Sequence, residues 1–409
     1  MASQAANPSK PWQLSGLAYG KGIPALCLLH QEIEQFYSYI QSTPTEFYLR
    51  AEAVRRIEEV VLFLWPSACV DVFGSFRTGL NLPNSDIDLV VHHGHYWNPG
   101  TPLHELKSEL VARGLTEMSS VSVLDKASVP VIKFTERVSR IKFDVTLNAA
   151  ASGVQAAELI KDFMRKFPEM PKLVMVLKQF LSLQGLNEVY SSGGVSSYAL
   201  TLMVISFLQQ QARSNKRYNV NNKLGLMLLQ FLDYYGRKFD FFKFGISVLG
   251  EGGCVEKERL RSTLGENNWQ SVLSIEDPVT PTNDIGRSSY AALHVMQGFK
   301  AAFLKLSKLV DSEASKIVGP ILANIVEVPQ NIVNYRTWVH YNFQHLLAPE
   351  SSSPPNPGGQ PPLSGTSNSA SEDERSDTQQ TVRNGFRRCG DGPPQNLDLD
   401  NTLANLKLN

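Results

Sequence analysis

Three aspartates in two short segments carry the chemistry that this sequence can support. Asp86 and Asp88 are separated by one residue in an apolar run. A β-strand would therefore place both carboxylates on one face and point the Ile87 side chain toward a hydrophobic core on the other. Two carboxylates this close repel each other, and a divalent cation between them is the usual reason to tolerate the repulsion. The segment 141–147 alternates apolar and polar residues and puts Asp144 on the polar face of a second strand.

Together, these acids predict a site for metal-assisted phosphoryl chemistry. If the two strands are neighbours, the three carboxylates converge, and a set of oxygen ligands suits Mg²⁺ or Mn²⁺. Two such ions, about 3.5–4 Å apart, would clamp the attacking and leaving oxygens of an in-line displacement. Gly74 and Ser75 close the preceding apolar run, where backbone N–H groups and a hydroxyl at a helix start can hold a triphosphate. Singly, each pattern also fits a turn or a solvated strand face; the prediction rests on their order along the chain.

Two helical segments further along the chain offer contacts for a phosphate and a base. Lys178 lies in an apolar run of a predicted helix over 171–184, so its ammonium either reaches solvent or faces an anion in a cleft. Ser197 and Tyr198 open the next helix, where a hydroxyl suits a phosphate and an aromatic ring can stack on a base. The alternative is that the serine caps this helix and the tyrosine packs in the core.

The order of Gly-Ser, Asp-x-Asp and a later single Asp resembles the nucleotidyltransferase superfamily that includes DNA polymerase beta. Within it, the stretch 74–91 resembles the Trf-type RNA poly(A) polymerases of the TRAMP surveillance complex. The resemblance runs from about residue 28 to about residue 345. Its other matching stretches are 123–130, 159–163, 176–181, 186–189, 193–198, 275–278 and 283–290.

The resemblance implies roles for further residues. It implies that Lys178 meets the triphosphate, that Asn148 contacts the ribose, and that a nucleotide-recognition loop contains Asn283, Asp284 and Arg287. Asn and Asp side chains in such a loop can read a base edge, but they also stabilise turns. Uridine-preferring relatives carry a histidine within this loop, whereas residues 283–288 contain none, which favours adenine.

Composition excludes several classes of protein. A chain of 409 residues with 42% hydrophobic content is an ordinary globular protein with room for two domains. Its four cysteines lack metal-site spacing and indicate a reducing compartment rather than a disulfide framework. No apolar run approaches the roughly 18–20 residues of a membrane span, and the N-terminus lacks an apolar signal core. A formal net charge of zero predicts weak, salt-sensitive RNA binding that a partner assists.

The pattern of elements predicts an α+β fold. The resemblance implies a polymerase-beta-like nucleotidyltransferase domain, with a mixed sheet and helices, inserted into a helical PAP-associated domain. Strands are predicted at about 69–73, 86–92, 129–134 and 141–147, and none after Ala150. The predicted domains are a disordered segment 1–20, a catalytic domain 66–150, a helical domain from 21–65 plus 151–346, and a disordered low-complexity tail 347–409.

The function predicted on this basis is template-independent addition of AMP from ATP to RNA 3′ ends, with two Mg²⁺ or Mn²⁺ ions. The resemblance implies a role in RNA surveillance and decay beside a zinc-knuckle RNA-binding protein and an RNA helicase. The location that it implies is the nucleus, with the cytoplasm as a second location. Two alternatives stay open: a terminal uridylyl- or mixed-nucleotide transferase, and a catalytically inactive scaffold of the same fold. A pure RNA-binding module is disfavoured because no RNP-type, zinc-knuckle or KH motif is present.

Overall fold

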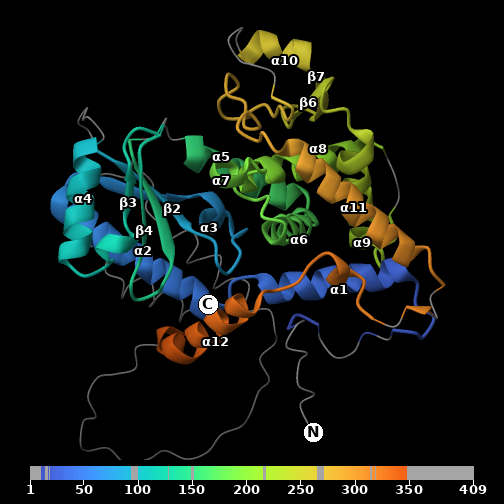
Figure 1. Ribbon diagram of the computed structural model, residues 1–409, viewed down its shortest axis with the longest axis horizontal. Helices are drawn as coiled ribbons and strands as arrows, with labels where there is room; N and C mark the ends of the chain where they lie inside the picture. Colours follow the sequence, from blue (N-terminus) through green and yellow to red (C-terminus); the bar gives the residue numbers. More distant parts are fainter. Residues whose placement is uncertain are drawn as a thin grey trace, which may run out of the picture. The chain divides into compact units, whose positions relative to one another are not determined.

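In a computed structural model, the chain divides into two compact units (Figure 1). The sheet unit contains Thr43–Val72, Ile87–Ala149 and the chain from Trp338, and the helical unit contains the rest. The predicted segments 1–20 and 347–409 lie, but for a few residues, outside the described part. The residues described are 11–13, 17, 19–93, 100–127, 129–148, 152–214, 218–264, 271–313, 316–317 and 319–347.

A five-stranded mixed sheet forms the sheet unit, with the strand order β1-β2-β5-β4-β3. β2 and β5 are parallel neighbours, whereas β4 runs antiparallel to both β5 and β3. Its strands are β1 (Cys69–Phe73), β2 (Ile87–His92), β3 (Ser122–Leu124), β4 (Val131–Thr135) and β5 (Lys142–Leu147). The predicted mixed sheet is confirmed, and the short β3 is the strand that the sequence did not reveal.

One face of this sheet is apolar and buried. Ile87 and Leu89 of β2 are fully buried, as their alternation with the aspartates predicted. On the same face, the rings of Phe134 and Phe143 stack with centroids 5.4 Å apart. The polar residues between them therefore belong to the opposite face, and this face carries Asp88.

Helices cover the sheet, and the first of them begins where its capping residues dictate. Thr43 Oγ1 accepts a hydrogen bond from the Glu46 amide, and the Glu46 carboxylate accepts one from the Thr43 amide at 2.8 Å. This reciprocal capping box fixes the start of α2. A second helix, α4, packs against α2, β3 and β4 (Figure 1). The elements are α2 (Pro44–Leu64), α4 (Gly100–Ala112) and the 3₁₀ turns η1 (Met118–Ser120) and η5 (Gln344–Leu347).

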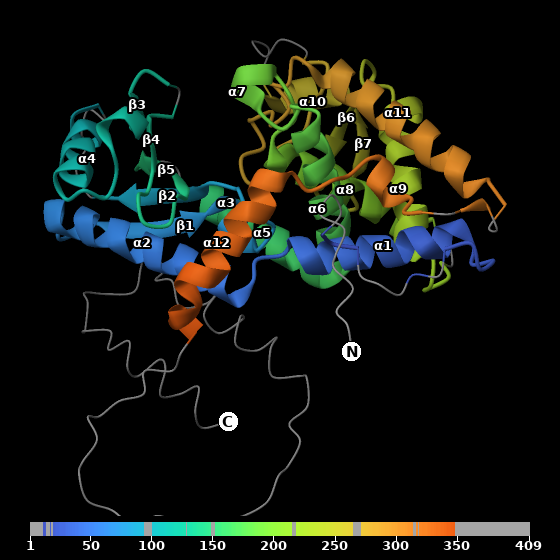
Figure 2. The ribbon, with the colours of Figure 1, turned by 60° about the horizontal axis from the view of Figure 1, so that its bottom comes forward.

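The helical unit is built around α6, whose residues are almost all buried. α1 packs against α6 and α9 (Figure 2). The helices are α1 (Ala25–Ile40), α3 (Gly74–Thr78), α5 (Ser152–Lys166), α6 (Met170–Leu183), α7 (Val189–Ser192), α8 (Ser197–Arg213), α9 (Lys223–Asp233), the π-helix η2 (Tyr234–Lys238), α10 (Lys257–Leu264), α11 (Ala292–Val310), the 3₁₀ turn η4 (Leu322–Asn324) and α12 (Gln330–Phe343). α12 begins in this unit and ends in the sheet unit.

Two features differ from the sequence expectations. A hairpin of β6 (Phe244–Ser247) and β7 (Gly253–Glu256) follows α9, although no strand was predicted after Ala150. Its four-residue strands contain Gly245 and are too short for alternation to stand out. The helix α2, which was predicted with the helical domain, groups with the sheet instead. None of the described helices combines the length and apolar character that a membrane span requires.

Candidate functional site

The Gly-Ser pair forms a tight turn of helix directly after β1. Gly74 has a φ of 65° and Gly79 a φ of 76°, the left-handed region that glycine adopts without strain. The amide of Leu80 donates to the Ser75 carbonyl at 3.1 Å, which closes α3. The two glycines therefore set where this short helix begins and ends.

An ion pair between side chains holds α3 against α5. Arg77 Nε lies 2.8 Å from Glu158 Oε1, and Lys161 Nζ lies 3.1 Å from the same oxygen. Burial alone would raise the pKa of Glu158, but hydrogen bonds and charge from Arg77 and Lys161 outweigh it and lower the pKa. The carboxylate therefore stays charged and fixes the turn that follows the Gly-Ser pair.

The sheet brings two of the three predicted catalytic aspartates side by side. Asp88 of β2 and Asp144 of β5 are register partners in the parallel pair, so their side chains leave the same face of neighbouring strands. Asp86 directly precedes β2 and is half-buried. The structure thus confirms that the strand of Asp144 adjoins the strand of Asp88.

A lysine on the next strand completes the row. Lys133 of β4 is the register partner of Asp144, and its Nζ forms an ion pair with Asp144 Oδ2. Among the described residues, which include all three aspartates, no group of three or more His, Cys, Asp or Glu side chains could hold a metal ion. In this structure Asp144 is thus paired with Lys133, and the convergence of the three acids on a metal ion stays a prediction.

Asn148 lies at the end of the same sheet. Its amide donates to the Val91 carbonyl at 2.8 Å, and its side-chain oxygen accepts a hydrogen bond from the His93 amide at 2.7 Å. Asn148 thereby ties the ends of β2 and β5 together from a left-handed backbone position, with a φ of 45°.

Lys178, predicted to meet a triphosphate, is buried in the helical unit. Only 6% of this residue is exposed, and its Nζ donates to the Leu80 carbonyl at 2.7 Å. The ammonium therefore does not extend into solvent along the helix surface. In this structure it holds the backbone just beyond the α3 turn.

The start of α8 separates the roles of three neighbouring residues. The N-cap is Ser196, whose Oγ accepts a hydrogen bond from the Ala199 amide, and the predicted Ser197 is the exposed first residue of the helix. Tyr198 is half-buried. Burial, followed by the nearby charge of Asp277, raises the pKa of its hydroxyl well above the usual value. The aromatic ring at this position thus carries a hydroxyl that stays neutral.

The predicted recognition loop is held together by its own carboxylates. Asp284 accepts hydrogen bonds at 2.8 Å from the amides of Ile275 and Gly286, and one at 2.7 Å from Ser271 Oγ. In the same loop, Asn283 Nδ2 donates to Asp277 at 2.9 Å. These bonds match the turn-stabilising alternative, whereas Arg287 is exposed.

Sequence reasoning missed two residues at these sites. Lys133 lies on the polar face of a predicted strand, but only the register of β4 against β5 reveals its partner. Asp277 anchors the recognition loop through Asn283 and the Val279 amide. The only sequence signal for Asp277 was its place in the matching stretch 275–278, directly after Glu276.

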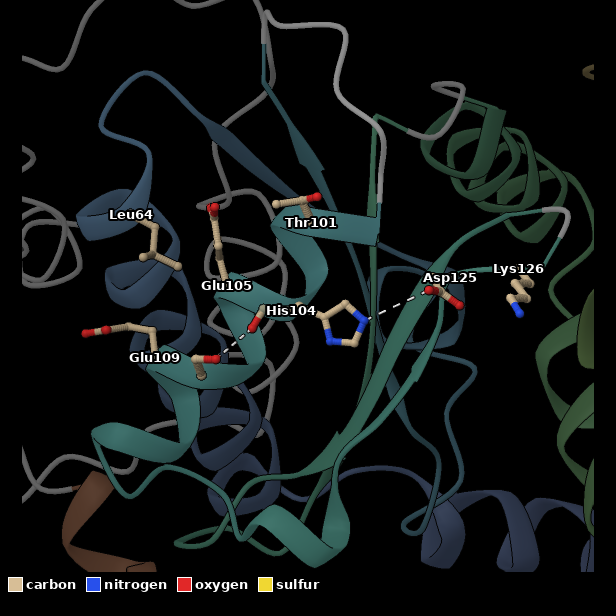
Figure 3. Close-up of a pocket in the computed structure, with 8 residues that line it drawn as sticks. Leu64, Thr101, His104, Glu105, Glu109, Asp125 and Lys126 are labelled. Carbon is tan, nitrogen blue, oxygen red and sulfur yellow. Dashed lines mark hydrogen bonds and ion pairs between the residues drawn. The ribbon is translucent and has the colours of Figure 1, made fainter.

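A hollow in the sheet unit is lined by none of the predicted site residues (Figure 3). It measures about 800 Å³ and faces His104, Glu105 and Glu109 of α4 and Asp125 and Lys126 after β3. His104 Nε2 lies 3.9 Å from Asp125 Oδ2. Three carboxylates and one lysine line this hollow.

Comparisons with known proteins identify the family. Residues 29–165 match the family model for the central palm domain of "Poly(A) RNA polymerase, mitochondrial-like" proteins. Residues 223–283 match the family model "Cid1 family poly A polymerase". The chain is 74% identical over 408 residues to a protein of Drosophila melanogaster named inactive non-canonical poly(A) RNA polymerase protein Trf4-2, and the match covers 99% of both. It spans less than half the length of the next curated relatives.

Solved structures share the fold. The polymerase core of TRAMP, an RNA surveillance complex, has a TM-score of 0.69 at 30% identity, covering 78% of this chain and 99% of that one. A Cid1 poly(U) polymerase mutant bound to MgATP has a TM-score of 0.59 at 22% identity, covering 72% of this chain and 98% of that one. The predicted α+β class with a nucleotidyltransferase sheet and a helical PAP-associated domain is confirmed.

The predicted activity is corrected by the same findings. We predicted an active RNA adenylyltransferase, but the relative that matches this chain along 99% of its length at 74% identity is named inactive. The prediction of an enzyme is therefore wrong, and the alternative of a catalytically inactive protein of the same fold is favoured. A motif records which residue types are present and cannot report whether their oxygens form a working site.

The resemblance to Trf-type polymerases is confirmed along the whole chain. The full-length match to a Trf4-type relative and the two family matches agree with the fold that is shared with the TRAMP polymerase core. This chain belongs to the Cid1 and Trf4 family of poly(A) RNA polymerases.

Proposed function

We propose that this protein is a catalytically inactive member of its family that acts as a scaffold. The observation that carries the proposal is the 74% identity over 99% of the chain to a relative named inactive.

The proposed assembly is an RNA surveillance complex in the nucleus. Support comes from the likeness to the polymerase core of TRAMP at 30% identity over 78% of this chain. In our proposal the scaffold contacts RNA and a zinc-knuckle RNA-binding protein, with an RNA helicase in the same assembly. The formal net charge of zero favours such a partner, because the chain lacks the basic excess of a strong RNA binder.

We also propose that the predicted site residues are the retained counterparts of the family's nucleotide site. The acids would be Asp86, Asp88 and Asp144, and Lys178 would shape the backbone at Leu80 rather than meet phosphate, as its burial supports. The further positions in this proposal are Gly74, Ser75, Asn148, Ser197, Tyr198, Asn283, Asp284 and Arg287.

A primer-extension assay tests the proposed loss of activity. The full chain is incubated with an oligoribonucleotide and each of ATP, UTP, GTP and CTP in turn, with Mg²⁺ or Mn²⁺, beside an active poly(A) polymerase of the family. A cooperative melting transition establishes that the preparation is folded. We expect no extension with any nucleotide. Extension that disappears in Asp88→Ala would refute the proposal and restore an enzymatic function.

The scaffold role is tested by binding. Gel filtration of the chain with a purified zinc-knuckle RNA-binding protein should yield a stable complex, and adding an oligoribonucleotide should shift it again without lengthening the RNA. If neither partner binds at physiological salt, the proposed scaffold role fails even when the chain is inactive.

A further inference from the structure

Three charged side chains form a continuous row across three neighbouring strands. Asp88, Asp144 and Lys133 are successive register partners on β2, β5 and β4. Their neighbours along the strands, such as Ile87, Phe143 and Ile132, are buried on the opposite face. The row is therefore a property of the sheet itself and does not depend on a loop.

The charges in this row demand a counterion. Adjacent parallel strands are about 4.8 Å apart, so the two carboxylates raise each other's energy when both are ionised. A divalent cation between them is one remedy, and a neighbouring ammonium is another. In this structure the second remedy is in place at Asp144, through the ion pair with Lys133 Nζ.

The partial exposure of the Asp144 and Lys133 side chains indicates an ion pair of moderate strength that solvent ions can reach. The Asp144 side chain is 22% exposed and that of Lys133 46% exposed. An ion pair at this depth is partly screened by solvent, so it can be displaced by a competing cation. The same carboxylate is thus available to either of two positive groups, but not to both at full strength.

We propose that Lys133 is the resident countercharge of this row and competes with divalent cations for Asp144. Metal affinity at Asp88 and Asp144 is then set by Lys133 as much as by the acids. The inference concerns the carboxylates of the proposed function but does not rest on the absence of turnover, because it is tested by metal binding alone.

Mn²⁺ binding to the full chain, followed by electron paramagnetic resonance of the free ion, tests the proposal. Lys133→Met should bind Mn²⁺ about fivefold more tightly than the parent chain, since a partly exposed ion pair of this kind is worth up to about that factor. Lys126→Met is the matched control, because it removes the same charge from the turn after β3. The control should bind Mn²⁺ as the parent does.

Three outcomes would overturn the proposal. The first is Lys133→Met binding Mn²⁺ no more tightly than the parent, and the second is an equal gain in Lys126→Met, which would indicate a general charge effect. The third is an undiminished gain from Lys133→Met in an Asp144→Asn background, where the carboxylate in dispute is gone. If Lys133→Met does not fold, Lys133→Gln poses the same question with a polar side chain.

Two further measurements sharpen the result. Lys133→Arg keeps the charge and should bind Mn²⁺ as weakly as the parent does. Raising the salt to about 1 M should reduce the gain in Lys133→Met, because screening already weakens the ion pair. Primer extension by the parent chain would refute the proposed loss of activity and leave this inference standing, so the two can fail separately.

Discussion

The loop at residues 283–288, predicted to recognise a nucleotide, and the sheet hold their acids in opposite ways. In the loop, the buried Asp284 accepts two backbone N–H groups and one hydroxyl. On the sheet, Asp144 is compensated by the ammonium of Lys133, a partly exposed side chain on the next strand. The loop acid is thus built into the backbone, whereas the sheet acid has a counterion that another cation can replace.

The difference separates an acid that shapes the fold from an acid that the fold presents. A carboxylate that accepts buried backbone N–H groups cannot be removed without leaving those donors unsatisfied. A carboxylate at a partly exposed ion pair can be removed with little penalty, because its partner turns to water. The first carboxylate therefore stabilises the fold, whereas the second is accessible to another cation, although both were predicted as site residues.

The largest expected effect is therefore in the loop. Asp284→Ala should lower the free energy of unfolding by about 3 kcal/mol, because the Ile275 and Gly286 amides lose their acceptor in a buried position. Urea unfolding measures this loss. Asn283→Ala, at an exposed neighbour with a single side-chain hydrogen bond to Asp277, is the control and should cost less than about 1 kcal/mol. Equal effects of the two variants would contradict a structural role of Asp284.

A methyl group at Gly286 should act on the same loop by sterics. A Cβ built there would lie 2.1 Å from the Leu273 carbonyl oxygen, so the backbone must move to admit it. Gly286→Ala should cost about 2 kcal/mol, as overpacked sites do. Gly319→Ala, where a Cβ would meet nothing within 4 Å, is the control for urea unfolding. An unchanged unfolding midpoint in Gly286→Ala would refute the close packing.

Local patterns predicted much of the fold. β2 could be predicted from the sequence, because its apolar residues alternate with aspartates. The β6–β7 hairpin could not be read, since its strands have four residues each. α12 also escaped prediction, because polar residues dominate its sequence and leave no clear apolar stripe.

The sequence could suggest candidate site residues but not their partners. That Asp88 and Asp144 lie on neighbouring strands was a condition of the sequence argument, and the register of β2 against β5 meets it. The partner of Asp144 could not be inferred, since pairing with Lys133 requires the register of a third strand. The proposed inactivity could not be inferred from the sequence either, because all three acids are present.

Glu158 stabilises the fold as Asp284 does, but through ion pairs as Asp144 has. The pH dependence of stability tests this role. Its pKa is lowered below the ordinary 4.5 chiefly by Arg77 and Lys161, which outweigh the opposing effect of burial. A carboxyl whose pKa is lower in the folded state stabilises the fold above pH 4.5, and that contribution is lost as pH falls through the lowered pKa. Glu158→Gln should therefore have a lower melting temperature than the parent at pH 7, and its free energy of unfolding should be lower by less than about 1 kcal/mol.

The gap between the two melting temperatures should close as the pH falls below 4.5. Glu313→Gln is the control, because its ion pair with Lys316 is largely exposed and should leave the melting temperature unchanged at every pH. A gap that stays constant down to acid pH would mean that Glu158 acts through packing and not through its charge.

The smallest effect is expected on the sheet, where the contrast with Asp284 is sharpest. Asp144→Asn should change the free energy of unfolding by less than about 0.5 kcal/mol, because losing the ion pair with Lys133 is offset by relief of the repulsion from Asp88. Urea unfolding beside Asp284→Ala measures both acids under one condition. A loss of about 2 kcal/mol or more in Asp144→Asn would show that this acid is also part of the framework, because a replaceable counterion cannot account for a penalty of that size.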